Sequence, residues 1–124
     1  MSLVEVRVTF EVEGGPTLRG VLKKSLAPLT VRRLLASSPH VTRCYFLDGR
    51  VAYFPLGLVA GEEKSTYEVK RGEIFYWIVG KSLCVALEDV RFPQRVNLLG
   101  RLEDPVEALA NVRSGSSVTI RLEE

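Results

Sequence analysis

The residues Gly80-Lys81-Ser82 stand in the order that ends a nucleotide-binding P-loop, whose chemistry is to hold a phosphate. That motif also needs a glycine five positions earlier, and this position holds Phe75. It further needs a helix after the lysine, because the N–H groups at a helix N-terminus bind the phosphate. Residues 82–87 are instead an apolar run with strand character. We therefore predict no phosphate site but a tight hairpin at Gly80-Lys81, with the glycine at positive φ.

The other residue types that carry catalysis are few, and their surroundings do not suit it. The single histidine, His40, follows a Ser-Ser-Pro helix stop, which predicts a surface imidazole and leaves no nucleophilic triad. Cys44 and Cys84 lie in apolar stretches, which favours buried free thiols over the alternative of a disulfide between them. No Cys or His spacing suits a metal ion. The sequence therefore predicts no catalytic residue, no metal site and no cofactor.

Composition and charge indicate one ordinary globular domain over residues 1–124. The chain is 46% hydrophobic and 26% charged, and its formal net charge of +2 is too small to indicate nucleic acid or an anionic membrane as partner. Basic residues such as Arg91 alternate with aromatic ones, as in binders of single-stranded nucleic acid, but acidic residues among them indicate a mixed-charge surface. No stretch reaches about 18 apolar residues, and no signal-peptide pattern opens the chain, so a cytoplasmic protein is expected.

Most of the chain is predicted to be β-structure. Alternating apolar residues over 4–12 indicate a half-buried strand, and Gly14-Gly15-Pro16 is a turn from which residues 18–22 return antiparallel. Asp48-Gly49 indicates a hairpin between residues 41–47 and 51–54. Further strands are predicted at 67–70, 73–79, 82–87, 96–102 and 118–122, with a loop at 57–65 and a long connection around Pro93. About eight short strands in a small domain predict a closed or nearly closed barrel, because closure removes exposed edges.

Two short α-helices are expected between these strands. In the first, Thr30 is expected to be the N-cap, and Pro39 ends the segment. In the second, Asp104 is expected to be the N-cap, Pro105 occupies the first helical position, and Glu107 completes a capping box. Asp104 and Glu107 are spaced as catalytic carboxylates could be, but capping accounts for both.

Aromatic residues suggest where a ligand would bind. Residues 73–79 are apolar on both faces, which predicts a strand covered on both sides. Its Tyr76 and Trp77 are interpreted either as core residues or as part of a pocket that Tyr45, Tyr53, Phe54 and Phe92 could join. Pockets of this kind are mostly apolar with a few placed polar groups. The candidate ligand-binding residues are Arg43, Tyr53, Tyr76, Trp77 and Asn97.

Several short stretches of the sequence together resemble a known family. They are Glu73-Ile74, Tyr76-Trp77, Gly80, Leu83-Cys84, Asn97, Gly100-Arg101 and residues 115–120. This family is the cyclophilin-like proteins of unknown function from archaea and bacteria, whose hallmark run reads like D-I-x-Y-W-P-P-G-x-A-L-C. The resemblance covers nearly the whole chain and implies a closed eight-stranded β-barrel with two short capping α-helices. Ile78 and Val79 replace the two prolines of the hallmark run, so the turn after Trp77 is expected to be less rigid than in the family.

Three hypotheses for function follow. The first is a barrel that binds a small molecule or peptide without isomerase chemistry. The second is a weak peptidyl-prolyl cis–trans isomerase, although the Phe-His-Arg and Gln-Gly-Gly-Asp runs of true cyclophilins are absent and Arg50 is expected in a hairpin turn. The third is an interaction module, which includes association into a homo-oligomer, that uses an exposed edge or the 88–95 loop, with Phe92 as an anchor.

Overall fold

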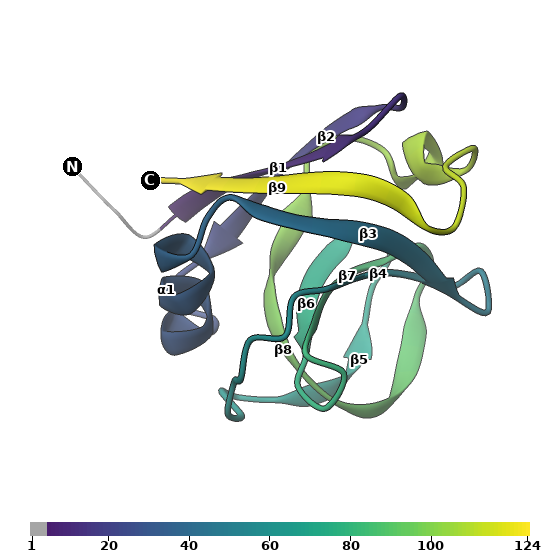
Figure 1. Ribbon diagram of the computed structural model, residues 1–124. Coiled ribbons are helices and arrows are strands. Elements are labelled where there is room, and N and C mark those ends of the chain that lie inside the picture. Colours follow the sequence, from purple (N-terminus) through teal and green to yellow (C-terminus); the bar gives the residue numbers. More distant parts are fainter. Residues whose placement is uncertain (1–4) are drawn as a thin grey trace.

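The computed structural model describes residues 5–124, which form a mainly β structure (Figure 1). One α-helix, α1 (Pro28–Ala36), and one 3-10 turn, η1 (Val106–Leu109), accompany the strands and lie on opposite sides of them (Figure 1). The strands of the described residues are β1 (Glu5–Val12), β2 (Thr17–Lys23), β3 (His40–Leu47), β4 (Val51–Pro55), β5 (Thr66–Val69), β6 (Glu73–Trp77), β7 (Ser82–Ala86), β8 (Val90–Leu102) and β9 (Ser116–Glu123).

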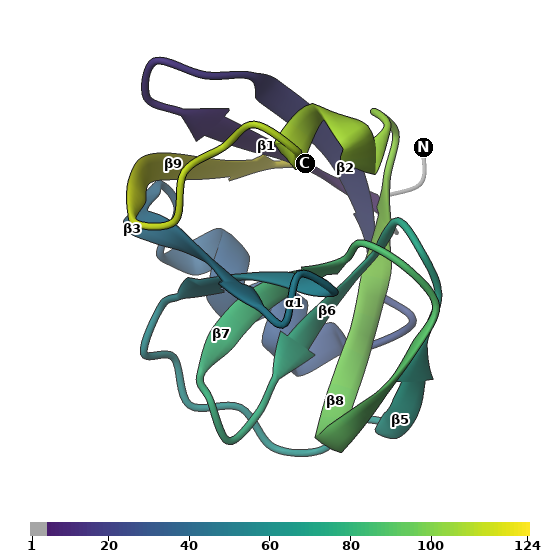
Figure 2. The same ribbon diagram turned by 90° about the vertical axis from the view of Figure 1, so that its right-hand side faces the viewer.

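Eight of these strands close into a barrel (Figure 2). Their order is β2-β1-β9-β3-β4-β7-β6-β8, each pair is antiparallel, and β8 pairs with β2 to complete the circle. The ninth strand, β5, pairs with β8 outside this circle. The expected closed eight-stranded barrel is therefore confirmed, with one strand added and one of its two α-helices replaced by a 3-10 turn.

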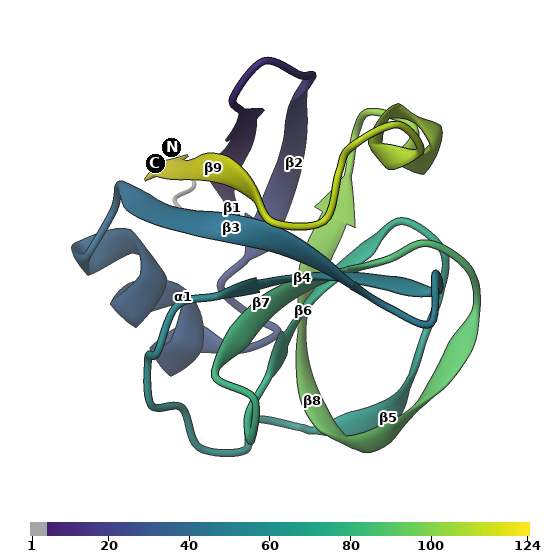
Figure 3. The ribbon, with the colours of Figure 1, turned by 45° about the vertical axis from the view of Figure 1, so that its right-hand side comes forward.

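Strand β8 is longer than predicted because it includes the expected connection around Pro93. Its first part pairs with β5, its middle with β6, and its end with β2, and it bends along the way (Figure 3). Pro93 lies between Arg91, opposite Glu68, and Val96, opposite Thr66, where the β5–β8 register shifts. A proline, which has no N–H to donate, is tolerated at such an irregularity.

The contact between β2 and β8 depends on two glycines. Gly100 lies opposite Leu22, and a Cβ atom on Gly100 would lie only 1.9 Å from the carbonyl oxygen of Val21. A Cβ on Gly20 would lie 2.9 Å from the carbonyl oxygen of Arg101. Neither position has room for a side chain, so the closure of the barrel requires glycine at both.

Strand β6 separates two hydrophobic cores. Ile74 and Tyr76 belong to the main core, with Phe10, Phe54 and the buried face of α1. On the other side of the strand, Phe75 belongs to a smaller core that includes residues from β4, β5, β7 and β8. The prediction that this strand is covered on both faces is confirmed for residues 73–77, whereas Val79, predicted as part of the same strand, lies in the turn after it and is 66% exposed.

In the turn between β6 and β7, the prediction that Gly80 has a positive φ is wrong. Lys81, and not Gly80, has a positive φ, of 49°. Gly80 is needed for space, because a Cβ there would lie 2.3 Å from ring atoms of Trp77. In the β3–β4 hairpin, by contrast, Asp48 and Gly49 have φ angles of 52° and 68°, as expected for that turn.

The start of α1 is capped by a residue distant in sequence, so the prediction that Thr30 is the N-cap is wrong. The N-cap position is Ala27, which offers no side-chain hydrogen bond. Instead, the carboxylate of Glu63 accepts hydrogen bonds from the backbone N–H of Leu29 at 2.9 Å and of Thr30 at 2.8 Å. It also accepts the Thr30 hydroxyl at 2.6 Å. The loop 56–65 thereby supplies the cap that the helix lacks locally.

This cap predicts a pH-dependent stability. Burial alone would raise the pKa of Glu63, but the hydrogen bonds from Thr30 and Leu29 outweigh it and hold the pKa below its ordinary value of 4.5. The stabilisation is therefore fully present above pH 4.5 and is lost as the pH falls through the pKa of the folded state. Glu63→Gln is expected to lower the free energy of unfolding by about 1 kcal/mol at neutral pH and by less in acid.

Urea denaturation from pH 7 to pH 3 measures this difference between wild type and variant. Glu62→Gln, at the exposed neighbouring position, is the matched control for the loss of one negative charge from the same loop. A wild-type-minus-Glu63→Gln difference that stays constant over the whole range would contradict the capping role.

The predicted second α-helix is a 3-10 turn because its expected capping residues bind elsewhere. The Asp104 carboxylate accepts the backbone N–H of Arg19 at 2.7 Å and its guanidinium at 3.3 Å. The hydrogen bond from the Arg19 side chain, with that from its backbone, holds the pKa of Asp104 below its usual range. Glu107 forms an ion pair with Arg71. Neither carboxylate caps η1, which has no side-chain cap.

Candidate functional site

The five residues predicted to bind a ligand lie in three separate places. Arg43, on β3, donates to the carbonyl oxygen of Gly115 at 2.7 Å. Tyr53 and Trp77 are neighbours, with ring centroids 5.9 Å apart and planes nearly perpendicular at 85°. Tyr76 and Asn97 lie opposite each other on β6 and β8. A ligand role for these residues stays a prediction, because their positions do not define one common pocket.

Tyr76 and Asn97 fasten the loop 56–65 to the barrel. The Tyr76 hydroxyl donates to the carbonyl oxygen of Leu58 at 2.7 Å, and burial raises the pKa of Tyr76 to about 12. The fully buried Asn97 accepts the backbone N–H of Glu63 at 2.8 Å. Its amide donates to the carbonyl oxygen of Gly61 at 2.8 Å and to the Thr30 hydroxyl at 3.2 Å. These polar groups therefore have partners within the chain.

Trp77 belongs to a row of aromatic side chains on the outer face of β6. Five rings are in contact one after another, with distances of 5.3 to 5.9 Å between neighbouring ring centroids. Their order is Tyr45, Tyr53, Trp77, Phe92 and Phe75. The Trp77 indole donates to the side-chain oxygen of Gln94 at 2.7 Å. Phe92 is 2% exposed, so its side chain is not available as the anchor that the third hypothesis expected. Its strand bends over the sheet and carries the ring into the smaller core.

The residues with intrinsic reactivity are held in unreactive surroundings. His40 is only 9% exposed, and its Nε2 lies 2.8 Å from the carbonyl oxygen of Leu34 in α1, so the prediction of a surface imidazole is wrong. Cys44 and Cys84 are free and buried, as predicted. Burial raises the pKa of Cys44 to about 11 and that of Cys84 well above its ordinary value. Over residues 5–124, no three His, Cys, Asp or Glu side chains come together to hold a metal ion.

Arg50, which the isomerase hypothesis singled out, lies in the β3–β4 turn as expected. Its backbone N–H donates to the carbonyl oxygen of Leu47 at 2.9 Å. Its guanidinium binds the carboxylate of Glu88 at 3.0 Å, and both side chains are about half exposed. The isomerase activity stays a prediction.

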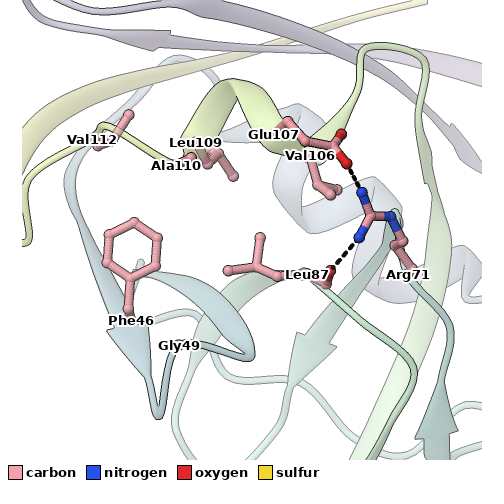
Figure 4. Close-up of a pocket in the computed structure, with 9 residues that line it drawn as sticks. All are labelled: Phe46, Gly49, Arg71, Leu87, Val106, Glu107, Leu109, Ala110 and Val112. Carbon is pink, nitrogen blue, oxygen red and sulfur yellow. Dashed lines mark hydrogen bonds and ion pairs between the residues drawn. The ribbon is translucent and has the colours of Figure 1, made fainter.

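A hollow of about 400 Å³ lies between η1 and the β3–β4 hairpin, and we call it the η1 pocket (Figure 4). The residues that line it are Phe46, Gly49, Arg71, Leu87, Val106, Glu107, Leu109, Ala110 and Val112. The side chains of Phe46 and Leu87 face those of Leu109 and Val106 across the hollow (Figure 4). Most of the lining is therefore apolar, as is usual for sites that bind small molecules.

One ion pair marks the polar edge of the η1 pocket. Arg71 pairs with Glu107, and its Nη1 donates to the carbonyl oxygen of Leu87 at 3.4 Å (Figure 4). The two charged side chains are 52% and 66% exposed. An ion pair as exposed as this contributes only about 0 to 1 kcal/mol, so it can open at little cost.

A second hollow, of about 700 Å³, runs along β5 and β8 and has a different chemistry. Charged residues of both signs dominate its lining, among them Lys64, Glu68, Lys70, Glu73 and Arg91. Mixed charges that face water give no single preference for a ligand. The η1 pocket is therefore the stronger candidate for a binding site.

Sequence reasoning missed the η1 pocket because its residues carry no local signal. In the sequence, Arg71 is one of several basic residues that are interleaved with acidic ones, and helix capping accounts for Glu107. The remaining lining residues are apolar side chains of the ordinary kinds that fill cores, apart from Gly49. The pairing of residues 71 and 107 arises only when the barrel closes.

The chain belongs to the cyclophilin-like family, whose model matches residues 5–121. The chain is similar to the hypothetical protein AF2241 from Archaeoglobus fulgidus, whose solution structure superposes with a TM-score of 0.77 at 28% identity over 95% of each chain. The structure of McbB in complex with tryptophan has a TM-score of 0.70 at 14% identity, over 92% of this chain and 44% of McbB, which shows a common fold. No curated protein matches the chain. Within residues 5–124, none of the helical segments has the length and apolar character needed to cross a membrane.

Proposed function

We propose that this cyclophilin-like barrel is a binding module for a small molecule or an apolar side chain of a peptide, and that the η1 pocket is its binding site. The observation that carries the proposal is the lining of this pocket, which is apolar except for one exposed ion pair. Val106 and Leu109 are at most 8% exposed, so the inner wall is packed in place before a ligand arrives. A preformed wall of this kind reduces the entropy lost on binding.

The same residues explain why the protein's own side chains leave this hollow open. The 3-10 turn η1 is short, and its Leu109 and Val106 are held by the main core, which also packs against Phe46 and Leu87. Ala110 presents only a methyl group at the rim (Figure 4). A larger side chain at this exposed position would occupy the hollow without disturbing the core.

Ala110→Trp is therefore expected to block ligand binding. Titration of the 15N-labelled protein with a mixed set of aromatic and branched aliphatic fragments should shift the amide signals of η1, Phe46 and Leu87. In Ala110→Trp, the affinity of any such fragment should fall by about tenfold or more, which equals ~1.4 kcal/mol. The matched control is Asn111→Trp, because Asn111 is the exposed neighbour and lies outside the lining. Fragments that shift only other regions, or that bind both variants alike, would contradict the proposal.

A further inference from the structure

We propose that the η1 pocket selects apolar molecules that end in a single carboxylate, which binds Arg71 in place of Glu107. This inference rests on the proposed function and assigns the chemical class of the ligand. The guanidinium of Arg71 lies at one side of the pocket, beside the apolar side chains of Leu87 and Val106 (Figure 4). A ligand whose apolar body fills the hollow would place one end against this guanidinium.

Arg71 is held in place from several directions. Its backbone N–H donates to the carboxylate of Asp89 at 2.9 Å. The next residue, Gly72, donates to the carbonyl oxygen of Ala86 and accepts from the N–H of Leu102, both at 2.8 Å. The turn that carries Arg71 is thus bonded to β7 and to β8 at once. The side chain starts from a fixed point, and its Nη1 also reaches the carbonyl oxygen of Leu87.

Glu107 shows what kind of group this guanidinium accepts. Its carboxylate approaches Arg71 from η1, the element that forms the facing wall of the pocket (Figure 4). The planar fork of a guanidinium matches a carboxylate better than a neutral group of similar size. Both side chains are more than half exposed, so Glu107 can turn into water when another carboxylate replaces it. The exchange keeps the charge of Arg71 paired.

The geometry points to two measurable effects. A carboxylate should bind more tightly than its neutral amide of the same shape, because only the carboxylate pairs with Arg71. Removing the negative charge of Glu107 should strengthen the binding of the carboxylate, because Glu107 both competes for Arg71 and repels an anion. The affinity of the neutral amide should respond little to either charge.

The probes are phenylbutyrate and its neutral amide, phenylbutyramide, titrated into the 15N-labelled full chain. In the wild type, the carboxylate should bind about tenfold tighter than the amide. Arg71→Gln should remove this preference, and Glu107→Gln should tighten the binding of the carboxylate by about threefold, as expected for the loss of one exposed competing charge. Arg50→Gln is the matched control, because Arg50 pairs with Glu88 and neither residue lines the pocket.

The outcomes separate this inference from the proposed function. If both probes shift the η1 pocket with equal affinity, the carboxylate selection is wrong while the binding site stands. A preference that survives in Arg71→Gln, or disappears equally in Arg50→Gln, also overturns the selection by Arg71. If neither probe, and no fragment of the mixed set, shifts the pocket, both proposals fall.

Discussion

Gly100→Ala is expected to destabilise the barrel by at least about 3 kcal/mol, because the added methyl group has no space at the contact between β2 and β8. Its carbon would lie 1.9 Å from the carbonyl oxygen of Val21 and 2.9 Å from the Cα of Leu22. Both contacts are with backbone atoms, which cannot turn aside as a side chain can. The two strands must separate, and the hydrogen-bonded circle then opens at the pair of Leu22 and Gly100.

Urea denaturation of the wild type and Gly100→Ala measures this loss. Gly61→Ala is the matched control, because a Cβ there meets nothing within 4 Å and the backbone does not need a positive φ. The control is expected to change the free energy of unfolding by no more than about 0.5 kcal/mol. Equal stability of the two variants would show that β2 and β8 need no close approach.

Asn97→Leu is expected to have the second largest effect, a loss of about 3 kcal/mol. Leucine has nearly the shape of asparagine but can neither accept the N–H of Glu63 nor donate to Gly61 and Thr30. Backbone groups of the loop 56–65 would then lose their partners next to a buried side chain. The loop is expected to detach, and Glu63 would leave the start of α1 with it.

Two measurements together test this expectation. Denaturation gives the loss of stability, and hydrogen exchange of the amides in the loop 56–65 and the first turn of α1 should become faster. The matched control is Asn111→Leu, since Asn111 is exposed. A stability loss with unchanged exchange in the loop would mean that Asn97 supports the core alone and does not anchor the loop.

Strand positions follow from short-range patterns, and this is why the barrel could be predicted from the sequence. The alternation in β1 buries Val6, Val8 and Phe10, as a half-buried strand requires. The continuous apolar run in β6 likewise indicates two covered faces, and the two cores provide them. Each of these signals lies within one strand and does not depend on its partners.

Helix caps and the length of β8 could not be predicted in this way. Glu63 caps a helix that begins far before it in sequence, and the partner of Asp104 is Arg19, 85 residues away. Such contacts exist only after the barrel has closed. Pro93 has the properties of a strand breaker, but its place in β8 is decided by the irregular pairing with β5.

The candidate binding residues show the same limit. Residue types in the sequence identified Tyr76, Trp77 and Asn97 as able to bind, but not which partners their polar groups would meet. Tyr76 and Asn97 bind the loop of their own chain, and Trp77 binds Gln94. The η1 pocket, by contrast, is formed by ordinary apolar residues and one ion pair. These residues come from four separate segments of the chain, which only the closed barrel brings together.

The place of β9 in the barrel has a consequence for biosynthesis. Strand β9 lies between β1 and β3, so the sheet around the barrel is interrupted until residues 116–123 join it. During translation, the earlier strands can form hairpins, but the circle cannot be completed while β9 is still inside the ribosome. Pairings between segments so far apart in sequence also make folding slow compared with helical proteins of this size. Of the eight strands of the barrel, β9 is therefore expected to be the last to join.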